Sequence, residues 1–516
     1  MAQRAVTITG HAWPGQVAAA CVAAFLLLPM AAVFWRAGGA GWLTAADWAA
    51  VRFTLLQATL SAVASTLLAI PVARALVRRR FPGRGAVIVL MGAPFILPVI
   101  VAVTGLIAVF GRGGMLNGLL TSLGFAPVTV YGLHGVVLAH VFFNLPLAVR
   151  VILQGWQGIP VERFRLAAQL GAGPGDVQRL LEWPMLRRVV PGVVAVIFAI
   201  CLSSFAVALT LGGGPRATTV ELAIFQAFTF EFDLGRAAML ATVQLALVTA
   251  AGLAALRLSR GEGFGAGLDR PFETWAKGGR WLRLADAMWI ALAALFLILP
   301  LVAVTIRGAG GLLVMPASVW TAALTSLSIA LGATALTMAL VLAMALSRSA
   351  WVEVAGIAPL AASSLVLGTG LFLLINPFDN PTRYALVVTM AVNVVMALPY
   401  ALRVVGQSAA ALEADYGRLA ASLDLRGLAR LRWLVLPRLR RQLGFAAGLT
   451  AALSMGDLGV ITLFADPRVA TLPLTVYRLI GSYQLEAAAG ASVLLVGLGF
   501  GVFLLFDLGG RGRADT

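Results

Sequence analysis

The sequence is poor in charge, in cysteine and in histidine, and each shortage excludes a class of protein. Charged residues make up 11% of the 516 residues and hydrophobic residues 60%, so there is too little polar surface to cover a water-soluble globule. The two cysteines, Cys21 and Cys201, both lie inside apolar runs, which argues against a disulfide framework or a thiolate metal cluster. The three histidines are scattered and predict no metal site.

Lysine is nearly absent: Lys277 is the single lysine among 38 basic residues. A phosphate-binding loop needs Gly-Lys-Ser/Thr, whereas Lys277 stands between Ala276 and Gly278. We therefore expect no ATP-binding motif, no catalytic residue, no metal and no cofactor in this chain. The net charge of +17 comes from arginines in short stretches between apolar runs, a distribution typical of membrane topology and not of nucleic-acid binding.

Apolar runs long enough to cross a bilayer recur along the whole sequence. A hydrocarbon core of about 30 Å takes roughly 20 helical residues. We predict an all-α polytopic membrane protein with a retained first span and cytoplasmic termini, an orientation that places most arginines in the cytoplasm. The twelve expected spans are 16–35, 53–77, 86–110, 132–154, 189–211, 237–257, 285–306, 319–346, 353–375, 384–405, 442–464 and 487–507.

The chain consists of two related halves. The stretches "NLPLAVRVILQ" and "ALPYALRVVGQ" align without gaps and pair Pro146 with Pro399, 253 residues further on. We expect these prolines to break their helices, either as paired hinges or as static kinks. Each half has six spans, an even number, which predicts parallel repeats with the same orientation. We expect domains at 1–257 and 285–516, joined by a glycine-rich, charged cytoplasmic linker at 258–284.

Each half also carries a polar segment on its predicted cytoplasmic side. The first reads "RLAAQLGAGPGDVQRLLEWP" from Arg165 and the second "RLAASLDLRGLARLRWLVLP" from Arg418. The first copy predicts a short helix ended by Gly171, a turn, and a second helix with Asp176 as its N-cap. Small residues on the first helix leave room for a partner to approach closely.

This pattern resembles the cytoplasmic loop of binding-protein-dependent ABC importer permeases, written E-A-A, three residues, Gly, nine residues, I-x-L-P. Both copies keep the nine-residue spacing, but both open with Arg-Leu, and Asp424 replaces the family glycine in the second copy. We therefore expect two coupling loops that are not equivalent, at 155–188 and 406–441. The alternative is a loop that only ties spans together. The residues expected to couple are Arg165, Ala167, Ala168, Gly171, Pro184, Arg418, Ala420, Ala421, Asp424 and Pro437.

The resemblance implies a type I ABC importer permease in a bacterial inner membrane. Its loops would dock on a separate cytoplasmic ABC ATPase dimer, and a periplasmic or extracellular binding protein would deliver the cargo. The stretches "RRRFPGR", "HGVVLAHVFFNLPLAVR" and "SMGDLGVITLF" resemble the thiamine and thiamine pyrophosphate permeases of this family. Fused ferric-iron permeases share the architecture, and an ion-coupled secondary transporter with parallel repeats is a further alternative.

Few polar residues lie inside the predicted spans, and each has two interpretations. Asp457, with Ser454 nearby, either faces the translocation path, where its carboxylate attracts a cation such as thiamine, or pairs within the helix bundle. His140 and Asn144 share one helix face. They either line the path or bridge helices, and bridging is the commoner role of such residues.

Overall fold

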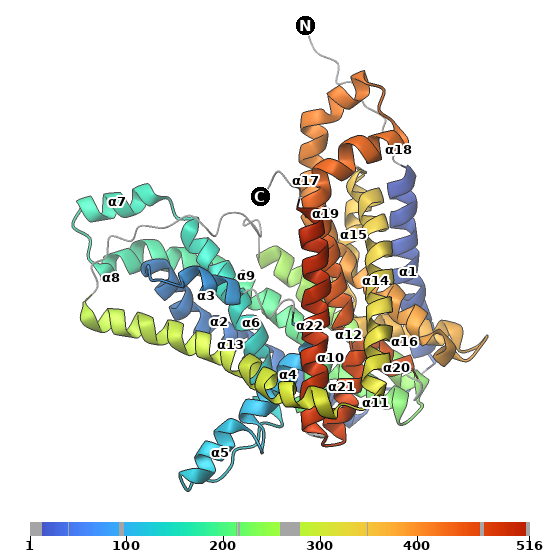
Figure 1. Cartoon of the computed structure of the whole chain (residues 1–516), viewed down its shortest axis with the longest axis horizontal. Coiled ribbons are helices and arrows are strands. Elements are labelled where there is room, and N and C mark those ends of the chain that lie inside the picture. The colour runs from blue at the N-terminus through green and yellow to red at the C-terminus, as the bar shows by residue number, and fades with distance from the viewer. Residues whose placement is uncertain are drawn as a thin grey trace. The chain divides into compact units, whose positions relative to one another are not determined.

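The computed structural model describes residues 13–39, 41–91, 97–212, 214, 217–258, 279–347, 349–464 and 469–511. Within these ranges every regular element is a helix (Figure 1), which confirms the predicted all-α class. Eleven helices in the described ranges are long and apolar enough to cross a membrane, so the chain is a multi-pass membrane protein. A twelfth span results if Ala350–Ala361 and Ser364–Ile375, bent by 97°, cross as one.

Eight predicted spans are each matched by one long helix. The helices α6 and α17 continue through Pro146 and Pro399, so neither proline interrupts its helix, and the hinge role stays a prediction. The eight helices are α1 (Trp13–Ala37), α2 (Ala45–Arg78), α6 (Leu133–Gln157), α12 (Leu234–Leu258), α13 (Arg280–Val314), α14 (Ser318–Ala345), α17 (Ala385–Ser422) and α22 (Leu485–Gly510).

The other four predicted spans are interrupted, and the interruptions fall in corresponding spans of the two halves. Two breaks, at Ser203–Ser204 and at Gly456–Leu458, lie 253 residues apart. Serine, glycine and aspartate weaken a helix interior, because they favour turn conformations. The helices on either side of the four breaks are α3 (Arg84–Leu90) and α4 (Val99–Phe110), α9 (Trp183–Leu202) and α10 (Phe205–Leu211), α15 (Ala350–Ile357) and α16 (Ser364–Ile375), and α19 (Leu436–Met455) and α20 (Gly459–Phe464).

Short helices complete the described chain. Two of them, α11 (Val220–Thr229) and α21 (Leu472–Gly481), begin 252 residues apart and extend the repeat beyond the spans. The remaining ones are α5 (Met115–Ser122), α7 (Val161–Gln169), α8 (Pro174–Val177), η2 (Gln178–Glu182), η4 (Ala358–Ala361), η5 (Pro381–Tyr384), α18 (Gly427–Arg430) and η6 (Leu431–Val435). Residues 259–278 of the predicted linker lie outside the described residues, and residues 280–284 begin α13.

The helices group into two compact units. The α2 unit comprises Trp42–Gln226 and Val243–Gly311, and in it α2 packs along α6 and α9. The α14 unit comprises Met1–Gly41, Ala227–Thr242 and Leu312–Thr516, and in it α14 packs along α17 and α19.

The first helix of each half packs in the unit built mainly from the other half. Thus α1 packs on α14, α15 and α16 in the α14 unit, while α13 up to Gly311 belongs to the α2 unit. The predicted domains follow the sequence repeat, whereas the compact units follow packing, and the two differ in where they place the first helices. The domain boundaries therefore stay a prediction.

A glycine permits each of these exchanged helices to approach closely. A Cβ atom added to Gly105 in α4 would lie 2.5 Å from the carbonyl oxygen of Pro300 in α13. A Cβ atom added to Gly370 in α16 would lie still closer to the carbonyl oxygen of Pro29 in α1. Neither position has room for a side chain. The same helix contact is therefore built twice, once in each unit.

Candidate functional site

The first loop (155–188) forms a helix, a tight turn and a second helix, as the sequence predicts. Helix α7 ends in a turn centred on Gly171, which has a φ angle of 71°. The Ala172 N–H donates to the Ala167 carbonyl at 2.9 Å, and the Gly171 N–H donates to the Ala168 carbonyl at 3.2 Å. This pair of bonds is a Schellman cap, which satisfies the free carbonyls at a helix end.

The second loop (406–441) has the same turn. Asp424 has a φ angle of 51°, the Leu425 N–H donates to the Ala420 carbonyl at 2.9 Å, and the Asp424 N–H donates to the Ala421 carbonyl at 3.2 Å. The exchange of glycine for aspartate therefore leaves the backbone unchanged. Asp424 also contacts the exposed Arg426 side chain at 2.6 Å.

The two loops differ instead in how they join the preceding span. In the first, α6 ends at Gln157, and Gly158–Ile159–Pro160 separates it from α7. The matching residues in the second, Ala411–Leu412–Glu413, lie inside the 38-residue helix α17. Proline at 160 lacks a backbone N–H and restricts the residue before it, whereas alanine, leucine and glutamate all favour a helix. The sequence difference at these three positions explains the separate helix.

The return to the membrane is similar in both loops. In the first loop the returning helix begins at Pro174, and the carboxylate of Asp176 accepts the Gly173 N–H at 3.0 Å. The prediction of Asp176 as N-cap was wrong, because the helix begins two residues earlier. A five-residue π-helical segment follows in each loop, η2 and η6, and Pro184 and Pro437 lie in the first turn of α9 and α19. Such segments are often found at functional sites.

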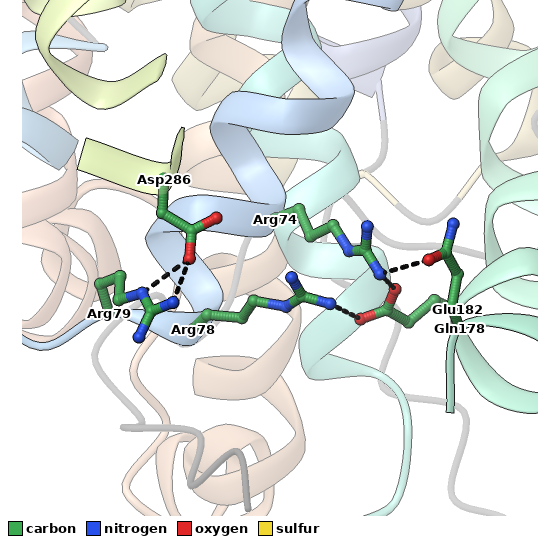
Figure 2. Close-up of polar contacts among 6 residues, drawn as sticks. All are labelled: Arg74, Arg78, Arg79, Gln178, Glu182 and Asp286. Atoms are coloured by element: carbon green, nitrogen blue, oxygen red, sulfur yellow. Dashed lines mark hydrogen bonds and ion pairs between the residues drawn. The ribbon is translucent and has the colours of Figure 1, made fainter. Parts of the chain in front are cut away.

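Ion pairs fasten the first loop to α2 (Figure 2). Glu182 at the end of η2 contacts Arg74 at 2.6 Å and Arg78 at 3.5 Å, and Gln178 accepts a hydrogen bond from Arg74 at 2.9 Å. The next arginine, Arg79, contacts one carboxylate oxygen of Asp286 in α13 through Nε and Nη2, both at 2.6 Å. Sequence reasoning missed these residues, because the hydrogen-bonding partners lie 104 or 207 positions apart.

The second loop is fastened within itself. Glu413 in α17 pairs with Arg430 in α18. The guanidinium of Arg438 lies 4.4 Å from the ring centroid of Tyr416 and donates to its hydroxyl at 2.9 Å. The matching positions in the first loop are Pro160, Val177, Met185 and Arg163, so these pairs have no counterpart there.

Most of the residues expected to couple are open to a partner. In α7 the side chain of Phe164 is buried and holds the helix, while Leu166 and, directly after the helix, Leu170 are exposed hydrophobic residues. An exposed apolar surface rimmed by polar residues is typical of a protein interface. Of the predicted residues, Arg165, Ala168, Gly171, Pro184, Arg418, Ala421, Asp424 and Pro437 are exposed, Ala167 is half-buried and Ala420 is buried.

His140 and Asn144 take part in helix bridging within the α2 unit. Nδ1 of His140 lies 3.1 Å from the Ser61 hydroxyl of α2, and Nε2 lies 2.6 Å from the Ser204 hydroxyl at the break between α9 and α10. Asn144 donates to the His140 carbonyl at 2.9 Å and contacts the sulfur of Cys201 at 3.3 Å. These contacts are those of the bridging interpretation.

Asp457 lies at the corresponding break in the α14 unit, 253 positions after Ser204. One of its carboxylate oxygens accepts the Gly459 N–H at 3.3 Å, and the other is buried without a partner among the described residues. Ser454 is bonded elsewhere, because it accepts a hydrogen bond from Asn393 at 2.9 Å. Asp457 thus bonds to a backbone N–H, and Ser454 bonds to Asn393.

Sequence reasoning also missed the buried acid Glu221. Glu221 in α11 is buried and accepts a hydrogen bond from Gln244 in α12 at 3.2 Å. The sequence signal is an acid within the apolar run "VELAIFQAF", which lies between the predicted spans 189–211 and 237–257. Among the described residues, no three histidine, cysteine, aspartate or glutamate side chains form a group that could hold a metal ion.

Comparison with known proteins finds relatives along nearly the whole chain. The thiamine transport system permease protein ThiP of Salmonella typhimurium is 41% identical, over 98% of this chain and 98% of its own length. The proteins of the same name from Brucella abortus and Haemophilus influenzae are 38% and 34% identical, over 93% and 86% of this chain and 92% and 86% of their own lengths. No protein-family model matches the chain.

Proposed function

This chain belongs to the family of thiamine transport system permease proteins, and we propose that it is the permease subunit of an ABC importer for thiamine and thiamine pyrophosphate. The observation that carries this proposal is the similarity over 98% of the chain to a relative of nearly equal length. Because the similarity includes both halves, one chain supplies both transmembrane domains. It converts the motion of its partner into transport and is not itself an enzyme.

The energy source in this proposal is a separate cytoplasmic ABC ATPase dimer. Each half carries an exposed loop with the same helix and Schellman cap, which provides one docking element for each ATPase subunit. Closure of the dimer moves both loops and the helices attached to them. A thiamine-binding protein on the other side of the membrane delivers the cargo, and the permease needs no cofactor or metal of its own.

Asp457 is the residue we assign to the cationic cargo. Thiamine carries a permanent positive charge on its thiazolium ring. A buried carboxylate oxygen with no hydrogen-bond partner in the part of the chain that the structure describes favours a cation. His140 and Asn144 serve the helix bundle in this proposal. His140 is already bonded to α2 and to the break after α9, and Asn144 contacts Cys201 in α9. Ser454 supports Asn393 in the same way.

The proposed location is the bacterial inner membrane with both termini in the cytoplasm. The arginines at the end of α2 and in the two loops then all face the cytoplasm, as the positive-inside rule requires. This orientation also presents both loops to an ATPase on the side where ATP is available.

Uptake of labelled thiamine by cells with and without this chain tests the cargo. We expect uptake only when the chain is present, and uptake of ferric iron instead would replace the thiamine assignment. Copurification with the tagged chain tests the mechanism, because an importer should retain an ABC ATPase and lose transport when ATP is depleted. Transport that survives ATP depletion, without an attached ATPase, would support an ion-coupled transporter.

A further inference from the structure

The contact between Glu182 and α2 links the first loop to a membrane helix that is distant in sequence. Arg74 and Arg78 lie four residues apart on one face of α2, and Gln178 and Glu182 lie four residues apart on η2 (Figure 2). Glu182 pairs with both arginines, and Gln178 adds a hydrogen bond to Arg74. The two side chains of η2 and the two arginines thus join this part of the loop to α2.

This contact is sheltered from water. The side chains of Arg78 and Glu182 are only 8% and 7% exposed. A buried charge has lost its hydration and is stabilised mainly by its partner. Separating such a pair therefore takes much more free energy than separating an exposed pair. Movement of η2 should therefore carry α2 with it.

A second ionic contact continues from α2 to α13. Arg79 follows directly after Arg78 and contacts Asp286 through two nitrogen atoms. Asp286 is buried and lies near the start of α13, the first helix of the second half. Three elements of the α2 unit are thus connected in series by two acids, Glu182 between η2 and α2, and Asp286 between α2 and α13.

The second half has no such contact at the matching positions. Leu431 and Val435 stand where the first half has Gln178 and Glu182, and both are apolar. The second loop is instead continuous with its span, since α17 runs without interruption from Ala385 to Ser422. In the first half the corresponding connection is broken at Gly158–Ile159–Pro160. The ion pairs that join the loop to α2 therefore occur in the half that lacks the continuous helix.

We propose that Glu182 and Asp286 are positioning residues of an ionic relay that transmits movement of the first loop to α2 and then to α13. The second loop transmits its movement through the continuous helix α17, so the two ATPase contacts drive the permease by different routes. This inference rests on the proposed function, because it concerns how the loops act once an ATPase is docked.

The test measures thiamine uptake and ATP hydrolysis by the reconstituted complex of the full chain, its ATPase and its binding protein. Glu182→Gln removes the charge that α2 holds while leaving the exposed docking residues of α7 intact. We expect the ATPase to remain bound and active, and uptake per ATP hydrolysed to fall about tenfold, within the usual range of coupling between sites. Asp286→Asn should lower the same ratio, because it breaks the second step.

Two further variants separate a relay from a merely structural role. Arg52→Gln is the matched control, since Arg52 is an exposed arginine of α2 that donates to the Trp48 carbonyl of its own helix, and the ratio should not change. The double variant Arg74→Glu with Glu182→Arg keeps one carboxylate between two guanidinium groups and should restore the ratio. A structural role would lower yield and thermal stability without changing uptake per ATP.

An unchanged ratio in Glu182→Gln, or a double variant that assembles without restoring it, would refute the relay. If Glu182→Gln does not fold, Arg74→Gln gives a second measurement, because Glu182 keeps Arg78; we expect a smaller fall in the ratio, and no fall contradicts the relay. Failure of the proposed function looks different. In that case the unmodified chain itself would bind no ATPase and take up no thiamine.

Discussion

At the residue scale, Asp424 adopts a backbone conformation that glycine adopts in the other half. Aspartate tolerates the left-handed region better than most residues, because its short polar side chain can bond locally. The φ angles of 71° at Gly171 and 51° at Asp424 close turns with the same two backbone hydrogen bonds. The substitution therefore alters the charge and shape offered to a partner and leaves the course of the chain unchanged.

This equivalence makes Gly171→Asp a clean probe of the docking surface. An added Cβ at Gly171 meets no atom within 4 Å, and we expect the left-handed conformation to cost about 1 kcal/mol, too little to unfold the loop. We predict that copurified ATPase falls several-fold while the thermal stability of the permease is nearly unchanged. Asp424→Gly in the second loop is the reciprocal control for stability. Full ATPase retention by Gly171→Asp would show that no close approach occurs there.

Asp457 permits a second test at this scale. Asp457→Asn keeps an oxygen to accept the Gly459 N–H and removes a charge whose second oxygen has no partner among the described residues, so folding should not suffer. We predict that thiamine uptake falls roughly tenfold, the effect of losing a charge-assisted contact of about 1.5 kcal/mol, with ATPase copurification unchanged. Glu353→Gln, an exposed acid in α15, is the control. Wild-type uptake by Asp457→Asn would remove this residue from the pathway.

At the scale of elements, the two halves share a close helix contact as well as similar sequence. The contact of Gly105 with Pro300 and that of Gly370 with Pro29 each join a helix beside a break to the first helix of the other half. Glycine serves there because helix backbones can approach only where no Cβ intervenes. Both contacts fasten an exchanged helix, so they hold the two halves in their shared packing arrangement.

We predict that Gly105→Ala lowers the stability of the purified permease by about 1–3 kcal/mol, the usual cost of overpacking. The new methyl group would lie 2.5 Å from a backbone oxygen, so one helix must shift. Gly118→Ala, in α5, meets nothing within 4 Å and should be neutral or gain up to about 1 kcal/mol of helix propensity. A thermal melt that ranks the two variants equally would contradict the close contact.

At the scale of the whole molecule, sequence reasoning succeeded where the signal is local. Long apolar runs predicted the all-α membrane class, and the alignment at 253 residues placed the paired loops, including the turn at Gly171. Sequence reasoning did not reveal the breaks inside four spans, because two residues such as Ser203 and Ser204 hardly change the mean hydropathy of a whole span. Nor did it reveal the ion pair of Glu182 with Arg74 or the packing of α1, because both depend on partners far away in the chain.

The exchange of first helices makes the two halves depend on each other for folding. Residues 1–268 alone would leave α1 without α14, α15 and α16, and residues 269–516 alone would leave α13 without Gly105 and its helix. We predict that each half expressed alone is degraded or aggregates through its uncovered apolar surface, and that the two halves expressed together copurify as a complex. Size-exclusion chromatography and thermal melts of the tagged halves check this. A half that purifies alone, monomeric and as stable as the intact chain, would show that its core is complete without the exchanged helix.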